Sequence, residues 1–98
     1  MHLKNVMRGL CSMKVVKISA VWCGSCINMK NIWREIEKEY DFEVINYDYD
    51  LDEEEVSKYN VGNILPVSII LNDENIELER IIGEKKKEEI ISIISKYM

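Results

Sequence analysis

Two cysteines separated by two residues are the side chains of this sequence best suited to chemistry. They are Cys23 and Cys26, in the segment Trp22-Cys23-Gly24-Ser25-Cys26. A close thiol pair can cycle between dithiol and disulfide, or bind a metal ion through its thiolates. The chain has three cysteines, an odd number and too few for a disulfide scaffold. In a reducing compartment the pair is therefore expected to be catalytic or metal-binding rather than structural.

A strand is expected directly before this pair and a helix directly after it. β-branched residues dominate positions 14–20, which predicts a buried strand. Over 24–40 the apolar residues recur at helical spacing: Met29, Trp33, Ile36 and Tyr40. This order places Cys23 at the helix N-terminus, where unpaired backbone N–H groups and the helix dipole favour an anion. The sequence therefore predicts that the thiolate of Cys23 is stabilised.

The composition restricts the partners that this chain can bind. Its 98 residues are enough for one domain with a single core, over residues 1–98. A formal net charge of −5 argues against nucleic acid and anionic membranes as partners. No apolar run approaches the ~20 residues of a membrane span, and residues 1–13 lack the apolar core of a signal peptide. We therefore expect a cytoplasmic monomer.

The remaining elements follow in an order that predicts an α/β fold. They are a strand over 42–48, a short helix over about 52–59, strands over 67–71 and 76–82, and a helix over 84–97. The strand–helix–strand unit predicts two parallel strands, and the turn residues at 72–75 predict an antiparallel hairpin. Helices on both faces would complete a three-layer α/β/α structure around a mixed four-stranded sheet. Residues 1–13 are compatible with a short helix or a frayed extension.

An acidic run follows the second predicted strand, and its carboxylates alternate in a way similar to a calcium-binding loop. The run comprises Asp48, Asp50, Asp52, Glu53, Glu54 and Glu55. The glycine and the spaced terminal glutamate of such a loop are missing. We therefore interpret the run as a solvated face and the acidic first turn of a short helix.

With these elements in place, the chain resembles the thioredoxin family over about residues 14–97. The segment from Trp22 to Cys26 is similar to the active site of that family. Pro66 lies where the family has a cis-proline, and Ile82 and Gly83 resemble the turn beside its substrate groove. The resemblance implies a thioredoxin fold. The first strand of full-length thioredoxin is expected to be absent, as in the minimal glutaredoxin-like form.

The resemblance also implies a protein-disulfide reductase without a cofactor other than its own disulfide. Cys23 would attack a client disulfide and Cys26 would release the client. Its partners would be disulfide-containing client proteins and an electron donor, either a reductase or glutathione. The peptide bond before Pro66 is expected to be cis. The residues implied in client binding are Trp22, Gly24, Ser25, Leu65, Pro66, Ile82 and Gly83.

Two positions in the active-site region depart from the family pattern. Ser25 stands where thioredoxin usually has proline, and its greater flexibility is expected to alter the redox potential. Lys17 stands where thioredoxin has a buried aspartate. Its ammonium would favour the thiolates if it lay beneath the cysteine pair, and we assign it a pKa-tuning role on that basis. Alternatively, its stem follows the sheet and carries the charge to solvent.

Two other functions are compatible with the sequence. The first is a zinc site formed by Cys23, Cys26, Cys11 and His2, which supply the usual number of ligands. It lacks the second Cys-x-x-Cys that zinc sites often have, and Cys11 is more simply a spare thiol. The second is a non-enzymatic interaction module with a thioredoxin fold. The presence of both cysteines favours an active enzyme over this module.

Overall fold

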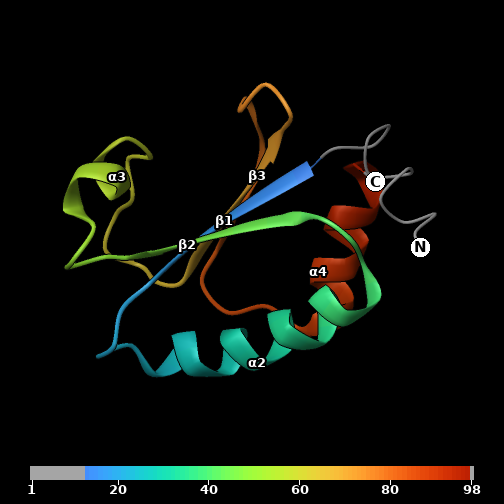
Figure 1. Ribbon diagram of the computed structural model, residues 1–98. Coiled ribbons are helices and arrows are strands. Elements are labelled where there is room, and N and C mark those ends of the chain that lie inside the picture. Colours follow the sequence, from blue (N-terminus) through green and yellow to red (C-terminus); the bar gives the residue numbers. More distant parts are fainter. Residues whose placement is uncertain (1–12, 98) are drawn as a thin grey trace.

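A mixed four-stranded sheet lies at the centre of the structure, a computed structural model that describes residues 13–97 (Figure 1). In chain order the strands are β1 (Met13–Ser19), β2 (Glu43–Asp48), β3 (Val67–Asn72) and β4 (Glu77–Ile82). Their spatial order is β2-β1-β3-β4. β1 is parallel to β2 and antiparallel to β3, and β3 is antiparallel to β4. The predicted parallel unit and the predicted hairpin are both confirmed.

Helices cover both faces of this sheet. They are α2 (Gly24–Glu39), α3 (Glu53–Ser57) and α4 (Lys87–Ile94), with a 3₁₀ turn, η1, over Ser95–Tyr97. Figure 1 shows α2 and α4 next to each other and α3 apart from them. In β1, Val15 packs with side chains of α2 and α4, whereas Val16 and Ile18 pack with Val56 of α3. Because neighbouring strand residues point to opposite faces, the helices form two layers around the sheet. The expected three-layer α/β/α structure is confirmed.

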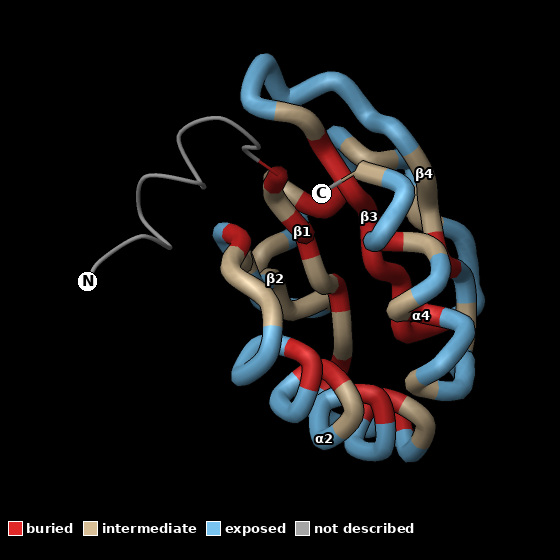
Figure 2. Tube along the Cα trace, turned by 90° about the vertical axis from the view of Figure 1, so that its right-hand side faces the viewer, coloured by how far each residue is buried: buried red, intermediate tan, exposed pale blue. Residues whose placement is uncertain are grey.

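The two central strands carry most of the core. Five consecutive residues of β3, from Val67 to Leu71, are buried, as expected for a strand that is covered on both faces. Figure 2 shows this run as buried and the outer face of α2 as exposed. Pro66 directly precedes β3, where its missing N–H breaks no ladder hydrogen bond.

Trp33 of α2 is almost completely buried against the sheet. Its ring meets Phe42 edge to face, with 6.1 Å between the ring centroids. Its indole N–H donates a hydrogen bond to the Ser68 hydroxyl of β3 at 3.2 Å. Ser68 is itself buried, so this bond satisfies two polar groups that water does not reach.

The last helix begins later than the sequence predicts, at Lys87 instead of Glu84. Glu84 and the lysines after it favour helices, and nothing in their order marks a helix start. In the structure the Lys85 N–H contacts the Met29 sulfur of α2 at 3.4 Å, and Lys86 is extended. Packing against α2 therefore overrides local propensity. The Lys86 N–H donates to Glu89 at 3.4 Å, which caps the later start.

Two expectations fall outside the described residues. These are the short helix or frayed extension over residues 1–13, of which the structure describes only Met13, and the absence of a first strand. Both stay predictions.

Replacing Ser68 with alanine is expected to lower the free energy of unfolding by about 1–3 kcal/mol, because it leaves the Trp33 N–H unpaired in the core. Urea denaturation measures the change. Ser57→Ala is the control, because Ser57 donates to a backbone carbonyl at the surface, and its effect should be under ~0.5 kcal/mol. Equal effects of the two substitutions would contradict the prediction.

Candidate active site

Cys23 forms the N-cap of α2. After β1 the chain turns, and the Cys23 N–H donates to the Ala20 carbonyl at 3.1 Å. Cys23 itself is extended (φ −97°, ψ 111°), and its sulfur accepts the Cys26 N–H at 3.3 Å. The first turn of α2 contains no acidic residue that would oppose a negative charge on this sulfur. The predicted position of Cys23 at the helix N-terminus is confirmed.

Cys26 lies one turn further along α2. Both cysteines are free thiols, and they are 9% and 7% exposed for Cys23 and Cys26 respectively. The pKa of Cys26 is raised from 9.0 to about 11, mainly because burial disfavours the thiolate. A hydrogen bond with Cys23 also raises this pKa, by more than a backbone hydrogen bond with Ala20 lowers it. Cys26 therefore keeps its proton near neutral pH.

Trp22 directly precedes the cysteine pair and is 61% exposed. Its indole N–H donates to the Asp50 carboxylate at 2.7 Å, and its ring meets Tyr49 edge to face with centroids 6.2 Å apart. Neither partner is predicted from the sequence, in which the acidic run is interpreted as a solvated face. One signal was available: Asp50 follows β2, and parallel strands bring the ends of β1 and β2 to the same edge.

The acidic run also forms hydrogen bonds of its own. The Asp48 carboxylate accepts the N–H groups of Asp50 and Leu51 at 2.9 and 3.0 Å, and Asp52 accepts the Asp48 N–H at 2.8 Å. These bonds shape the turn that holds Asp50 against Trp22. The first turn of α3 is acidic, as the sequence predicts.

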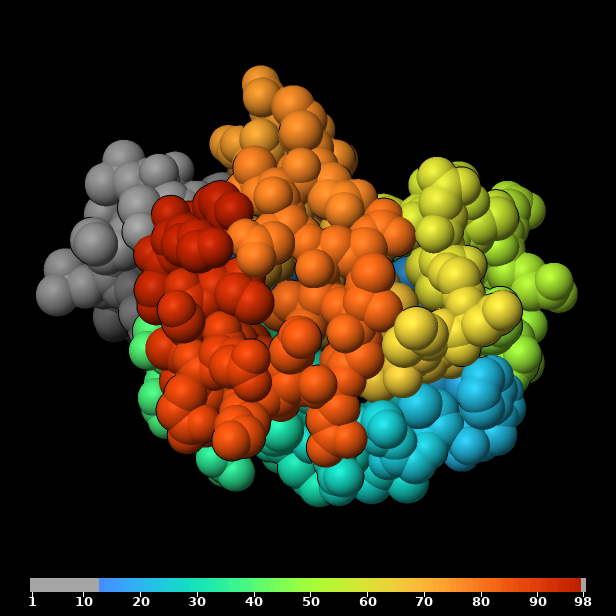
Figure 3. All heavy atoms as spheres, turned by 180° about the vertical axis from the view of Figure 1, so that it is seen from behind, coloured from blue at the N-terminus to red at the C-terminus, as the bar shows by residue number. Residues whose placement is uncertain are grey.

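The loop that ends at Pro66 packs against the cysteine pair. The Leu65–Pro66 peptide bond is cis, as expected, and the Leu65 side chain lies in the same buried cluster as Cys23 and Cys26. Figure 3 shows this segment, in yellow, lying against the blue start of α2 and the orange end of β4. The Leu65 side chain is thus a core residue, which leaves only its backbone for other contacts.

The turn after β4 is joined to this loop. The Gly83 N–H donates to the Pro66 carbonyl at 2.8 Å. Gly83 has a φ of +83°, a conformation that other residues seldom adopt, so this turn requires glycine. Ile82 and Ile64 are exposed beside it. Gly24 is exposed and Ser25 half-buried at the start of α2. Ile64 is not among the residues predicted from the sequence.

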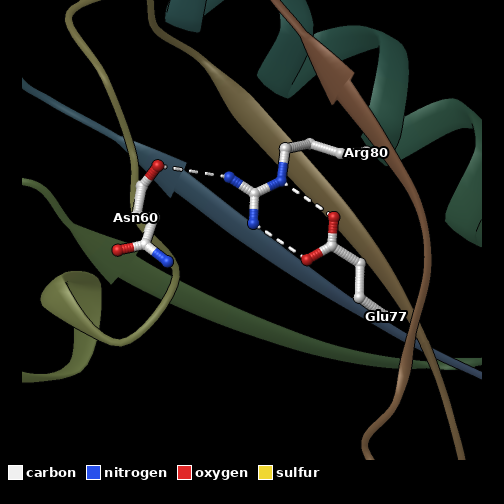
Figure 4. Close-up of polar contacts among 3 residues, drawn as sticks. All are labelled: Asn60, Glu77 and Arg80. Carbon is white, nitrogen blue, oxygen red and sulfur yellow. Dashed lines mark hydrogen bonds and ion pairs between the residues drawn. The ribbon is translucent and has the colours of Figure 1, made fainter.

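Arg80 fixes the first part of the same loop to β4 (Figure 4). Its guanidinium makes two hydrogen bonds of 2.9 Å to the Glu77 carboxylate and a third, of 3.4 Å, to the Asn60 carbonyl. The Arg80 side chain lowers the pKa of Glu77. Asn60 has a positive φ of 53°, so the chain turns sharply where Arg80 holds it. The loop is therefore fixed at Asn60 and again at Pro66.

Lys17 reaches from β1 into a cavity of about 590 Å³ that Cys26 also lines. Its ammonium lies 2.7 Å from the Glu37 carboxylate and 5.6 Å from the centroid of the Trp33 ring. Glu37 is three helical turns beyond Cys26, which is about 16 Å along the axis of α2. The ammonium is thus directed along the helix to a carboxylate. The pKa-tuning role of Lys17 stays a prediction.

Two of the four residues of the alternative zinc site, His2 and Cys11, lie outside the described residues. Over residues 13–97 there is no group of three or more histidine, cysteine or acidic side chains that could hold a metal ion. In the same part of the chain, no helix has the length and apolar character needed to cross a membrane.

The reduced protein is expected to lose stability as the pH rises from about 9 to about 11, because the folded state holds the Cys26 proton more tightly than the unfolded chain. The stability that protonated Cys26 provides is fully present below pH 9 and amounts to roughly 2–3 kcal/mol. Urea titrations of reduced protein across this range measure it. Cys26→Ser is the control and should show a shallower decline, and parallel declines would contradict the prediction.

Lys17→Met and Glu37→Gln are expected to shift the pKa of Cys26 in opposite directions. Lys17→Met leaves a bare carboxylate on the cavity and should raise this pKa, whereas Glu37→Gln leaves a bare ammonium and should lower it, each by less than about one unit. The double variant should return close to the wild-type value. Thiol alkylation as a function of pH measures the shifts. No shift in either single variant would show that the ion pair only supports packing.

Comparison with known proteins places this geometry in a family. Residues 4–96 match the family model described as Thioredoxin. A thioredoxin from Staphylococcus epidermidis is 26% identical over 87 residues, which cover 87% of this chain and 82% of that protein. The solved structure of a thioredoxin from Nicotiana alata has a TM-score of 0.80 at 27% identity, over 97% of this chain and 81% of that chain. A mutant thioredoxin from Halobacterium salinarum shares the fold, with a TM-score of 0.81 at 21% identity and the same coverage. The chain belongs to the thioredoxin family, whose members are thiol–disulfide oxidoreductases.

Proposed function

We propose that this protein reduces disulfides in client proteins through a dithiol–disulfide cycle of Cys23 and Cys26. The observation that carries the proposal is the different environment of the two sulfurs. The Cys23 sulfur accepts a backbone N–H at the positive end of α2, whereas burial keeps the proton on Cys26. One sulfur is thus suited to attack and the other to wait in its protonated form.

The cycle has two exchange steps. In the first, the Cys23 thiolate attacks one sulfur of the client disulfide; the bond to Cys23 forms, the client bond breaks, and the second client sulfur leaves as a thiolate. In the second, Cys26 loses its proton and attacks the Cys23 sulfur. The mixed disulfide breaks, the client leaves with a thiol after taking up a proton, and the Cys23–Cys26 disulfide remains. The client gains two electrons and the protein loses two.

The client would bind across the exposed groups around Cys23. The backbone of Leu65, before Pro66, would pair with an extended client segment as an added strand does. Trp22 and Ile82 provide exposed apolar surface on this face. The turn at Gly83 would border the same groove. Gly24 and Ser25 would contact the client at the start of α2. Within the described part of the chain, a Cβ at Gly24 would have no heavy atom within 4 Å apart from its chain neighbours and its own helix backbone.

Thioredoxins work through their own cysteines and need no cofactor. The oxidised pair of this protein would be reduced again by a reductase or by glutathione. A reducing compartment, the cytoplasm, suits a protein that must return to its dithiol form. The non-enzymatic alternative is less well supported, because it gives no reason for a sulfur to accept the helix N-terminal N–H.

Cys26→Ser is expected to trap the client as a stable mixed disulfide with Cys23, because the second step then has no attacking thiol. Cys23→Ser should form no such adduct and should reduce nothing. A peptide with a single disulfide is a suitable client, and non-reducing electrophoresis with mass analysis detects the adduct. The wild-type protein should reduce many equivalents of the peptide when a chemical reductant regenerates its dithiol, and this turnover completes the test.

The opposite trapping pattern would reverse the roles of the two cysteines. Absence of both turnover and adduct, in a protein whose fold is intact, would overturn the proposed function and favour the interaction module.

A further inference from the structure

A hollow of about 510 Å³ lies beside Trp22, between the end of β2 and α3. Its lining is Tyr49, Asp50, Glu53, Val56, Ser57, Asn60 and Val61. Two of these residues contact Trp22: Asp50 accepts its indole N–H, and the Tyr49 ring packs against it. The hollow is therefore adjacent to the residue that precedes Cys23.

The hollow is negatively charged. Asp50 and Glu53 contribute carboxylates, and no ion pair within residues 13–97 neutralises either of them. Among the side chains of the described residues, the Asp50 carboxylate receives one hydrogen bond, from the neutral indole N–H of Trp22. Next to Glu53, Glu54 and Glu55 complete the acidic first turn of α3. The hollow can thus accept positive charge without first breaking an internal ion pair.

Three large apolar side chains are exposed near this acidic hollow. One is Trp22, which Asp50 and Tyr49 contact; the others are Val21, which precedes Trp22 in the sequence, and Leu51, which follows Asp50. Trp22 is 61% exposed, Val21 is 88% exposed and Leu51 is 84% exposed. Exposed apolar groups of this size beside polar residues are typical of a surface that binds another protein. A lysine or arginine fits both features, because its stem packs on apolar surface while its charged end meets carboxylates.

We propose that this hollow binds a lysine or arginine side chain of the client, so that the preferred clients carry a basic residue near the cysteine that Cys23 attacks. The inference rests on the proposed function and specifies its substrate class. A bound metal ion is a poorer fit, because residues 13–97 contain no group of three or more acidic, histidine or cysteine side chains in suitable positions. Charge complementarity beside the reactive sulfur therefore selects a basic segment.

Three disulfide peptides that differ at one position near the reactive cysteine test the inference, with lysine, glutamine or glutamate there. Two such sets of three peptides are used: in one set the varied position precedes the reactive cysteine, and in the other it follows the cysteine. At low salt, kcat/KM should be about twofold to fivefold higher for lysine than for glutamine in one of the sets. Glutamate should be the poorest. The differences should shrink at high salt, because the charges lie at the surface.

Asp50→Asn and Glu53→Gln remove the two charges from the hollow with little change in shape. The amide introduced by Asp50→Asn keeps an oxygen that can accept the Trp22 N–H, so loss of that hydrogen bond does not confuse the result. Each variant should reduce the preference for lysine, and the double variant should remove it. The preference is taken as the ratio of kcat/KM for the lysine peptide to that for the glutamine peptide, so a change common to both peptides does not affect it.

Glu54→Gln is the matched control, because it removes the same charge from the same helix at a residue that does not line the hollow. Glu74→Gln makes the same change in the distant turn between β3 and β4. Both should keep most of the lysine preference. Equal rates for the three peptides, with normal turnover, would overturn this inference and leave the proposed function intact.

A loss of preference in Glu54→Gln or Glu74→Gln as large as in Glu53→Gln would also overturn it, because net charge and not the hollow would then explain selection. Failure to reduce any peptide would overturn the proposed function together with this inference.

Discussion

The hydrogen bond from the Cys26 N–H to the Cys23 sulfur is the interaction on which the site depends. It makes one cysteine the cap of α2 and sets the other one turn deeper, so a single local geometry gives the two sulfurs different surroundings. The cap exists because β1 ends at Ser19 and the chain turns at Ala20, where the Cys23 N–H is also bonded. The chemistry therefore follows from where a strand ends and a helix begins.

Three hydrogen bonds between segments distant in the sequence then fix the loops that surround Cys23. The Trp22–Asp50 hydrogen bond joins the turn before α2 to the end of β2. The Gly83–Pro66 hydrogen bond joins the turn after β4 to the loop before β3. Arg80 holds the other end of that loop at Asn60. Each contact joins elements that the sheet has already brought together, so the fold supplies the positions and a few polar groups fix the loops between them.

The sequence predicts the local part of this arrangement well and the long-range part poorly. The strand, the cap and the helix around Cys23 follow from hydrophobic period and residue type, which are properties of neighbouring positions. The partners Asp50 and Glu37 lie 28 and 20 residues from Trp22 and Lys17, and no local pattern marks them. The late start of α4 has the same cause, because it depends on contact with Met29 and not on the propensities of Glu84 and Lys85. Prediction thus fails where tertiary contact outweighs local preference.

Lys17 shows how such a contact changes the electrostatic effect expected of a residue. Taken alone, a cation on the strand below the cysteine pair suggests a field that favours both thiolates. Glu37 places an opposite charge 2.7 Å from that ammonium, so the pair acts on Cys26 as a dipole whose effect falls faster with distance than that of a single charge. Burial then dominates at Cys26 and holds its proton. Burial is therefore the main cause of the raised pKa of Cys26. The Lys17–Glu37 ion pair allows a charged side chain to line the same cavity, because the two charges offset each other.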